Sequence, residues 1–107
     1  MAKKSIKGTL EKPRLSVFRS NNNIYAQVID DTSANTILSS STREKVVQER
    51  LLGGGSNCSA ATIVGQILGS RLKEKNIQKI VFDRGRYPYH GRIEALANGI
   101  RESGLNF

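Results

Sequence analysis

Apolar and polar side chains alternate along three short segments in the first half of the chain. Leu15 and Val17 fall on one face of the segment 14–19, and the same period of two recurs over residues 24–30. This period is typical of a β-strand with one buried face. A third segment, over residues 36–42, is largely polar, so we expect it to have an exposed face or to lie near a sheet edge. Short turns between the segments would make an antiparallel meander.

The apolar spacing changes to that of a helix after three consecutive glycines at residues 53–55. Apolar residues spaced three or four apart predict a helix that buries one face and ends at Asn76. A short apolar run over residues 77–82 predicts a fourth strand, and a second amphipathic helix follows it and ends near Gly104. The candidates for the residue that caps the first helix are Ser56, Asn57 and Ser59.

The predicted order of elements is β-β-β-α-β-α, which describes an α/β fold. We expect a single-domain sandwich whose mixed sheet contains an antiparallel three-strand meander and a parallel crossover strand. A length of 107 residues suits one such domain, which we assign to residues 14–107. Residues 1–13 hold four lysines and one acidic residue and are predicted to be a flexible basic N-terminal arm. The alternative for the arm is a frayed terminus that only aids solubility.

Charge and cysteine content narrow the kind of partner and compartment. The chain has 17 Lys and Arg against nine Asp and Glu, a net charge of +8. Such a charge destabilises a compact state unless a polyanion neutralises it, so nucleic acid is the expected partner and a merely soluble basic protein is the alternative. Cys58 is the only cysteine, which favours a reducing compartment. No apolar run approaches the length of a membrane span or a secretory signal, which favours a soluble, internal protein.

The most informative segment runs from Asp83 to Arg92, directly after the predicted fourth strand. Its arginines can bind phosphate oxygens, and its tyrosines and histidine present flat faces for stacking on unpaired bases. Its two glycines are expected to let the backbone approach closely. The alternative is a loop whose tyrosines only cover the sheet edge. The candidate RNA contacts in this segment are Arg84, Gly85, Arg86, Tyr87, Tyr89, His90, Gly91 and Arg92.

A second basic cluster lies on the first predicted hairpin, where a strand with two arginines meets an Asn-rich turn. Phe18 falls on the polar face of that strand, where a ring can stack on a base, although a Phe in a strand is more often part of the core. Lysines of the arm would neutralise phosphates. The candidate RNA contacts are Lys3, Lys4, Lys7 and Lys12 in the arm, and Arg14, Ser16, Phe18, Arg19, Ser20, Asn21, Asn22 and Tyr25 in the hairpin.

Three patterns could belong to an enzyme, and each has a simpler explanation. The glycines at 53–55 lack the Gly-Lys followed by Ser or Thr that a phosphate-binding loop uses. His90 stands with no recognisable Ser or Cys nucleophile. Asp30, Asp31 and Asp83 could converge on metal ions for nuclease chemistry. The first two more simply form a turn, and Asp83 more simply pairs with a neighbouring arginine or a loop amide.

We therefore expect no enzyme, no metal and no cofactor. Two rivals to a structural RNA-binding protein remain. One is a protein-interaction module that uses the polar third strand as a pairing edge. The other is a free-standing RNA-binding regulator, for which the same surface would serve.

Two separated signatures resemble those of one family. Residues 13–21, Pro-Arg-Leu-Ser-Val-Phe-Arg-Ser-Asn, followed by Ile-Tyr-Ala-Gln-Val-Ile-Asp-Asp at 24–31, resemble the opening of bacterial and organellar large-subunit ribosomal protein eighteen. The second signature of that family is matched by Val-Phe-Asp-Arg-Gly at 81–85, Tyr-His-Gly-Arg at 89–92 and Ala-Leu-Ala at 95–97. The usual ending of the family is similar to Gly-Leu-Asn-Phe at 104–107. The likeness covers about residues 7–107.

The resemblance implies a non-catalytic protein of the large ribosomal subunit, in plastid stroma or bacterial cytoplasm. It implies binding to 5S ribosomal RNA, attachment of that RNA to 23S ribosomal RNA in the central protuberance, and a place beside large-subunit protein five. This chain has a short Lys-containing start where bacterial members have a longer Arg-rich arm, which leaves the arm's contribution open. The RNA contacts implied at matching positions are Arg14, Ser16, Phe18, Arg19, Ser20 and Asn21, and Arg84, Gly85, Tyr87, Tyr89, His90, Gly91 and Arg92.

Overall fold

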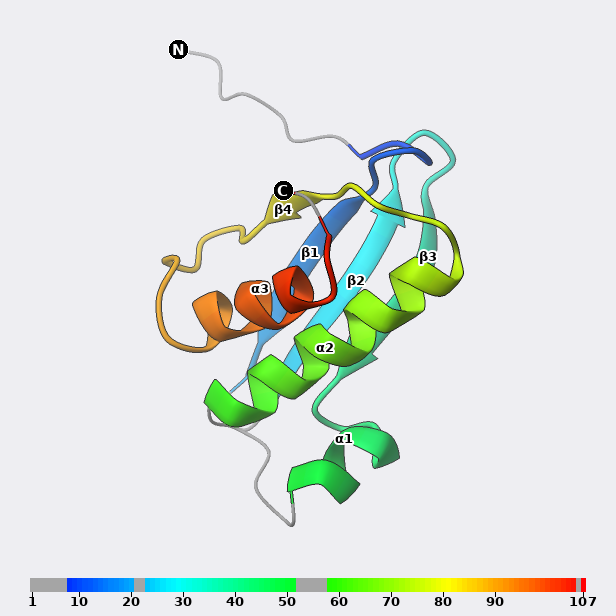
Figure 1. The fold of residues 1–107 in the computed structure, drawn as a ribbon. Coiled ribbons are helices and arrows are strands. Elements are labelled where there is room, and N and C mark those ends of the chain that lie inside the picture. Colours follow the sequence, from blue (N-terminus) through cyan, green and yellow to red (C-terminus); the bar gives the residue numbers. More distant parts are fainter. Residues whose placement is uncertain (1–7, 21–22, 52–57, 106) are drawn as a thin grey trace.

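The computed structural model describes residues 8–20, 23–51, 58–105 and 107. Within these ranges, the strands form a sheet with helices packed beside it, an α/β arrangement (Figure 1). The elements are β1 (Arg14–Arg19), β2 (Ile24–Asp30), β3 (Asn35–Ser41), α1 (Lys45–Leu51), α2 (Cys58–Glu74), β4 (Val81–Asp83) and α3 (Arg92–Glu102).

The strands form one mixed sheet in the order β3-β2-β1-β4. β1 and β2 pair antiparallel, with Phe18 opposite Tyr25, and β2 and β3 also pair antiparallel. β4 lies parallel to β1, with Asp83 beside Ser16. The α/β class, the three-strand meander and the parallel crossover strand are thereby confirmed. β3 lies at an edge of the sheet, as its polar composition indicated.

Helices α2 and α3 cover one face of the sheet (Figure 1). Leu15 and Ala26 from the sheet and Leu68 and Leu96 from the helices are fully buried between the two layers. Burial of apolar surface contributes roughly 25 cal/mol per Å², so this layer is the main source of stability. The opposite face of the sheet, which we call the open face, carries no helix in the described part of the chain.

Glycines let α2 and α3 pack closely. A Cβ atom added to Gly65 would lie 2.3 Å from the carbonyl oxygen of Leu96, and one added to Gly99 would lie 2.3 Å from that of Thr62. Both distances are far below van der Waals contact, so a larger residue at either position would push the helices apart. This close packing fixes the start of α3, and with it the loop that leads into the helix.

Part of the predicted arm, residues 8–13, lies against the sheet. The amide of Gly8 donates to a carboxylate oxygen of Asp31 at 2.7 Å, and the amide of Asp31 donates to the carbonyl of Gly8 at 3.0 Å. The amide of Val81 donates to the carbonyl of Pro13 at 2.9 Å. Both ends of this stretch are therefore tied to the domain, whereas residues 9–12 between them are exposed. Of the arm's candidate contacts, Lys12 is exposed, whereas Lys3, Lys4 and Lys7 lie outside the described residues.

The structure contains one helix that the sequence pattern does not predict. α1 is seven residues long and includes two valines, so its helical pattern is weak. Val47 is fully buried and anchors the helix to the core. The predicted order β-β-β-α-β-α is therefore incomplete by this element.

The remaining differences concern element ends. The fourth strand is shorter than the predicted run 77–82, although Ile77 and Ile80 within that run are buried. Ser59 lies inside α2, so its assignment as a cap is wrong, and the other two candidate caps and the three glycines before them lie outside the described residues. Asn76 has a φ of 60° just after α2, which confirms it as the helix stop.

Candidate nucleic-acid interface

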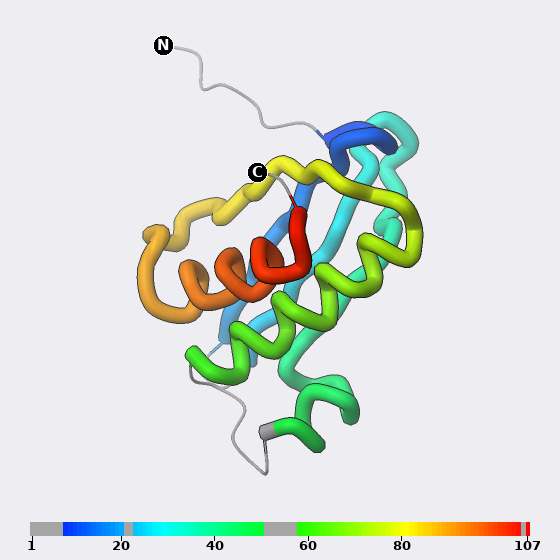
Figure 2. The backbone as a smooth tube through the Cα atoms, viewed as in Figure 1, coloured from blue at the N-terminus to red at the C-terminus, as the bar shows by residue number. Residues whose placement is uncertain are grey.

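The loop between β4 and α3, residues 84–91, runs beside β1, and we call it the basic loop. Asp83 pairs with Ser16 at the end of β4, and Tyr87 reaches Arg19 at the end of β1. The residues between Asp83 and Tyr87 therefore follow the outer edge of β1. Figure 2 shows the loop, gold to orange, standing out from the β4 side of the sheet.

Arg84 and Arg86 are exposed on the basic loop. Within the described chain neither side chain forms a hydrogen bond or an ion pair with protein, so both are available to bind phosphate. Gly85 and Gly91 have φ values of 61° and 59°, and a Cβ atom on either would meet nothing within 4 Å. No other part of the described chain therefore approaches the backbone closely at these two glycines, contrary to expectation. Glycine is favoured at both positions because the backbone is in the left-handed region.

Tyr87 joins the basic loop to β1. The amide of Arg19 donates to the Tyr87 hydroxyl at 3.1 Å, and that hydroxyl donates back to the Arg19 carbonyl at 3.4 Å. The Arg19 guanidinium lies 5.0 Å from the centre of the Tyr87 ring. Because β4 ends beside Ser16, Tyr87 satisfies backbone groups of β1 beyond the reach of β4.

Tyr89 packs into an aromatic cluster with the end of the chain. Its ring meets Phe82 edge-on at 6.2 Å, and Phe82 stacks on Phe107 at 5.6 Å. The Tyr89 hydroxyl accepts a hydrogen bond from Arg101 at 2.7 Å, and the Arg101 guanidinium lies 4.4 Å from the Phe107 ring centre. Both tyrosines of the loop thus have contacts within the chain, and their stacking on RNA stays a prediction. His90 is exposed.

Arg14 bridges two carboxylates at the opposite end of β1. Its Nε and Nη2 donate to Asp31 at 2.9 and 3.1 Å, and its Nη1 donates to Asp83 at 3.0 Å. The hydrogen bond to Asp31 raises the pKa of Arg14 above its ordinary value, although burial opposes the shift. Asp83 also accepts from the amide of Gly85 at 2.9 Å, which confirms the expected loop-amide bond. Its arginine partner, however, is Arg14 and not a neighbour in the loop.

The third aspartate considered for metal binding, Asp30, is the last residue of β2, and its carboxylate holds the turn that follows. Its carboxylate accepts hydrogen bonds from Thr32 and Ser33. The hydrogen bond from the Thr32 hydroxyl lowers the pKa of Asp30 despite the opposing effect of burial. Among the described residues, no cluster of three or more His, Cys, Asp or Glu could hold a metal ion. No helix of the described chain is long and apolar enough to cross a membrane.

The end of the first hairpin lies close to the start of α3. The amide of Ser20 donates to the carbonyl of Asn23 at 2.8 Å, and the amide of Asn23 donates to the Ser20 hydroxyl at 3.2 Å. Arg92 Nη1 donates to the Ser20 carbonyl at 3.4 Å. The two clusters of candidate contacts, separate in sequence, therefore meet at this end of β1. Asn21 and Asn22 lie outside the described residues.

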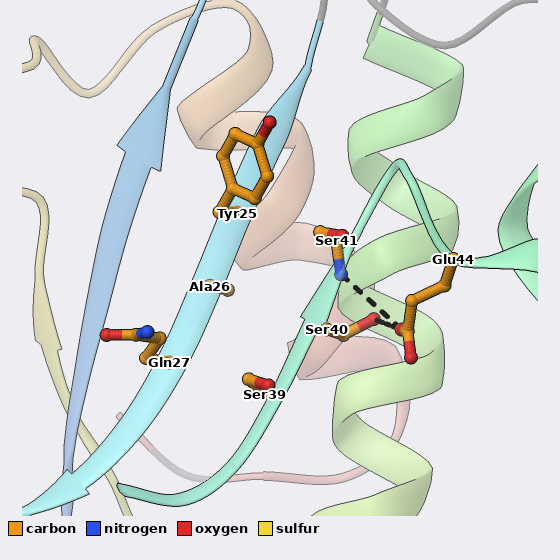
Figure 3. Close-up of a pocket in the computed structure, with 7 residues that line it drawn as sticks. All are labelled: Tyr25, Ala26, Gln27, Ser39, Ser40, Ser41 and Glu44. Atoms are coloured by element: carbon orange, nitrogen blue, oxygen red, sulfur yellow. Dashed lines mark hydrogen bonds between the residues drawn. The ribbon is translucent and has the colours of Figure 1, made fainter.

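The open face of the sheet carries an aromatic pair. Phe18 is 59% exposed, and its ring centre lies 5.7 Å from that of Tyr25. Figure 3 views β2 and β3 with the helices behind them and shows Tyr25 and Gln27 on β2. Ser16, Phe18, Tyr25 and Gln27 line a shallow hollow on this face. Gln27 is not among the contacts predicted from the sequence, because a polar residue on an alternating strand gives no signal of its own.

The whole chain, residues 1–107, matches the family described as ribosomal L18 of archaea, bacteria, mitochondria and chloroplasts. The large ribosomal subunit protein uL18c of Guillardia theta is 59% identical over 102 residues, which cover 95% of this chain and 94% of that protein. The large ribosomal subunit protein uL18 of Symbiobacterium thermophilum is 52% identical over 105 residues, 98% of this chain and 85% of that protein. The large ribosomal subunit protein uL18c of Phaeodactylum tricornutum is 53% identical over 102 residues, which cover 95% of this chain and 75% of that protein.

Proposed function

The chain belongs to the ribosomal L18 family of archaea, bacteria, mitochondria and chloroplasts, and from this membership we propose that it binds 5S ribosomal RNA and helps attach it to 23S ribosomal RNA. Membership makes the chain a structural protein of the large ribosomal subunit, not an enzyme, in association with ribosomal RNA and other ribosomal proteins. Its setting is the ribosome of plastid stroma or bacterial cytoplasm. A place in the central protuberance beside large-subunit protein five belongs to the proposal.

The observation that carries the proposal is a pair of guanidinium groups on the basic loop that have no partner in the part of the chain that the structure describes. Arg84 and Arg86 are exposed, and the loop that bears them is held at Asp83 by β-pairing and at Tyr87 by hydrogen bonds to β1. A loop held at both ends loses less conformational entropy on binding than a free one. The two arginines are therefore positioned in advance for a phosphate backbone of fixed shape.

The distribution of charge supports an RNA partner. The net charge of +8 attracts a polyanion, and the planar guanidinium of arginine can donate two parallel hydrogen bonds to the oxygens of one phosphate. The proposed contacts are the arm, hairpin and loop residues named from the sequence, with residues 14–107 as the binding domain and residues 1–13 as a basic arm, of which residues 8–13 already lie against the sheet. Arg14 would contribute only the two guanidinium N–H groups that do not donate to Asp31 or Asp83.

A titration against two RNAs at several salt concentrations tests the proposal. The full chain is mixed with 5S ribosomal RNA and with a control RNA of equal length, and the bound fraction is measured by filter binding. We expect saturable binding that prefers 5S RNA. If about six phosphates are neutralised, log K falls against log salt with a slope of roughly −4 to −5. Equal, weak binding to both RNAs would contradict the proposal.

A further inference from the structure

Phe18 is exposed on a strand whose other apolar residues are buried. Leu15 and Val17 face the helices, whereas 59% of the Phe18 side chain is exposed on the open face. Single exposed apolar residues are common and need no explanation by themselves. Phe18, however, has an aromatic cross-strand neighbour, Tyr25, whose ring is tilted by 38° at a centroid distance of 5.7 Å. The two rings form an aromatic surface on the open face, over which no helix lies among the described residues.

Polar groups stand beside this aromatic surface. Ser16 pairs across the strands with Gln27, two residues along each strand from the Phe18–Tyr25 pair and on the same face, and the four residues line one hollow. Within the described chain, neither the Gln27 amide nor the Tyr25 hydroxyl makes a side-chain hydrogen bond to protein. The hollow therefore offers one flat apolar wall together with free donors and acceptors at its rim.

Two arginines of the basic loop lie beside β1, the strand that contributes Ser16 and Phe18 to the hollow. The basic loop follows the outer edge of β1 from Ser16 to Arg19, and Phe18 lies between these two positions on the strand. Arg84 and Arg86 are exposed on that stretch of the loop. A ligand with an anionic backbone and a flat, hydrogen-bonding attachment would match both features at once, and that description fits a nucleotide within a strand of RNA.

We propose that the hollow formed by Ser16, Phe18, Tyr25 and Gln27 binds one unpaired base of the RNA. The base stacks on Phe18, its polar edge faces the Gln27 amide and the Tyr25 hydroxyl, and its phosphates face Arg84 and Arg86. This inference rests on the proposed function and deepens it, because it places an unpaired nucleotide at a defined site. A base within a duplex is stacked on both sides and cannot enter the hollow, so the site selects a loop or bulge.

The absence of tryptophan from the chain makes a direct test possible. In the variant Phe18→Trp the single indole reports on the hollow, and stacking on a base quenches its fluorescence. Val46→Trp is the matched control, because Val46 is also exposed, at 37%, lies on α1 and is not among the residues that line the hollow. With 5S ribosomal RNA we expect quenching for Phe18→Trp and little change for Val46→Trp. A perfectly paired RNA duplex of equal length should not quench Phe18→Trp.

Affinity measurements supply the second arm of the test. Phe18→Leu keeps an apolar side chain of similar size but removes the π-face, and should weaken binding to 5S RNA about tenfold, whereas Phe18→Tyr should retain parental affinity. Circular dichroism confirms that each variant is folded. Unchanged affinity of Phe18→Leu together with unquenched Phe18→Trp, in a chain that still binds 5S RNA, would overturn the inference alone. Failure of the parent chain to prefer 5S RNA would overturn the proposed function and the inference with it.

Discussion

The hydroxyl of Tyr87 lies 3.1 Å from the backbone nitrogen of Arg19, and the Arg19 guanidinium lies 5.0 Å from the Tyr87 ring centre. One residue of the basic loop thus holds both the backbone and the side chain at the end of β1. The two segments most suggestive of RNA binding in the sequence are therefore joined as one surface. Tyr87 acts first as the support of that surface, whatever it contacts on the RNA.

Removing the Tyr87 hydroxyl should weaken both stability and binding. Tyr87→Phe leaves the ring in place but deprives the Arg19 amide and carbonyl of their partner, so we expect a loss of about 0.5–1.5 kcal/mol in the free energy of unfolding. Affinity for 5S RNA should fall a few-fold, because the loop is less firmly held. Urea unfolding and RNA titration measure the two effects. Tyr25→Phe is the control for stability, since the Tyr25 hydroxyl has no hydrogen bond to described protein groups, and an equal loss in both variants would contradict the role given to Tyr87.

Removing the exposed arginines of the basic loop should weaken binding and leave the fold intact. Arg84→Ala and Arg86→Ala together remove two phosphate contacts, which should reduce the magnitude of the salt slope by about 1.4–1.8. The free energy of unfolding should change by less than about 0.5 kcal/mol, because neither side chain has a partner in the described chain. The measurements are the salt-dependent titration and urea unfolding of the double variant.

Arg50→Ala with Lys73→Ala is a charge-matched control for that pair. Both residues lie on helices, away from the basic loop, and the double variant loses the same two positive charges. It should reduce RNA affinity only through the smaller net charge. If the double variant of Arg84 and Arg86 unfolds instead, the loop is a structural element and not a binding one.

Alternation along β1 and β2 was enough to predict the sheet and its two faces. The burial of Leu15, Val17, Ala26 and Val28 against the helices follows directly from the period of two. Helix α1 escaped prediction because its position is fixed by tertiary contacts. Val47 is buried, and the Gln48 amide donates to the carbonyl of Thr42, neither of which a short segment reveals by its own pattern.

The candidate site was predictable by residue type but not by arrangement. Arginines and tyrosines after β4 indicated a nucleic-acid surface. In the sequence, Arg14 and Arg84 are both arginines in a basic segment, yet Arg14 lies between two carboxylates in the structure. Which arginine is free depends on partners 17 and 69 residues away in sequence. Periodicity cannot report contacts of that range, so the structure was needed to separate supporting residues from available ones.

Stability should decrease in acid through Glu44. Burial raises the pKa of this carboxyl, but hydrogen bonds from Ser40 and Arg71 outweigh it and hold the pKa below the ordinary value of 4.5. A pKa lowered by folding means that the ionised form stabilises the folded chain above about pH 4.5, and that this contribution is lost as pH falls through the folded pKa. In the variant Glu44→Gln, the free energy of unfolding should therefore depend less steeply on pH between pH 3 and pH 6. This range extends roughly 1.5 units to either side of the ordinary pKa. Urea unfolding at several pH values measures the dependence.

The cost of Glu44→Gln at neutral pH should be modest. Its contact with Arg71 is half-exposed, at 3.0 Å, and such ion pairs contribute about 0.2–1 kcal/mol. Glu74→Gln, an exposed carboxyl on the same helix as Arg71, serves as the control. If the free energy of unfolding of both variants depends on pH as it does in the parent chain, Glu44 is not responsible for the loss of stability in acid.

The pairing of Arg14 with Asp83 should give a measurable coupling energy. The Arg14 side chain is only 21% exposed and donates to Asp31 as well, so Arg14→Ala should cost about 2 kcal/mol of unfolding free energy. Asp83→Asn removes one of the same contacts. The double variant should therefore lose less than the sum of the two, by about 0.5–3 kcal/mol, when all four chains are unfolded in urea.

The same variants separate the structural role of Arg14 from its proposed role on RNA. Arg14→Lys keeps the positive charge but cannot reach both carboxylates with a planar fork, so it should lose stability while retaining most phosphate attraction. At a temperature where every variant is folded, a stability loss with near-parental 5S affinity would make support of β1, β4 and the chain at Gly8 the main role of Arg14, with RNA contact a smaller one. A large affinity loss without coupling to Asp83 would instead make RNA contact the main role of Arg14. We expect the first outcome, because three of its N–H groups already donate to carboxylates.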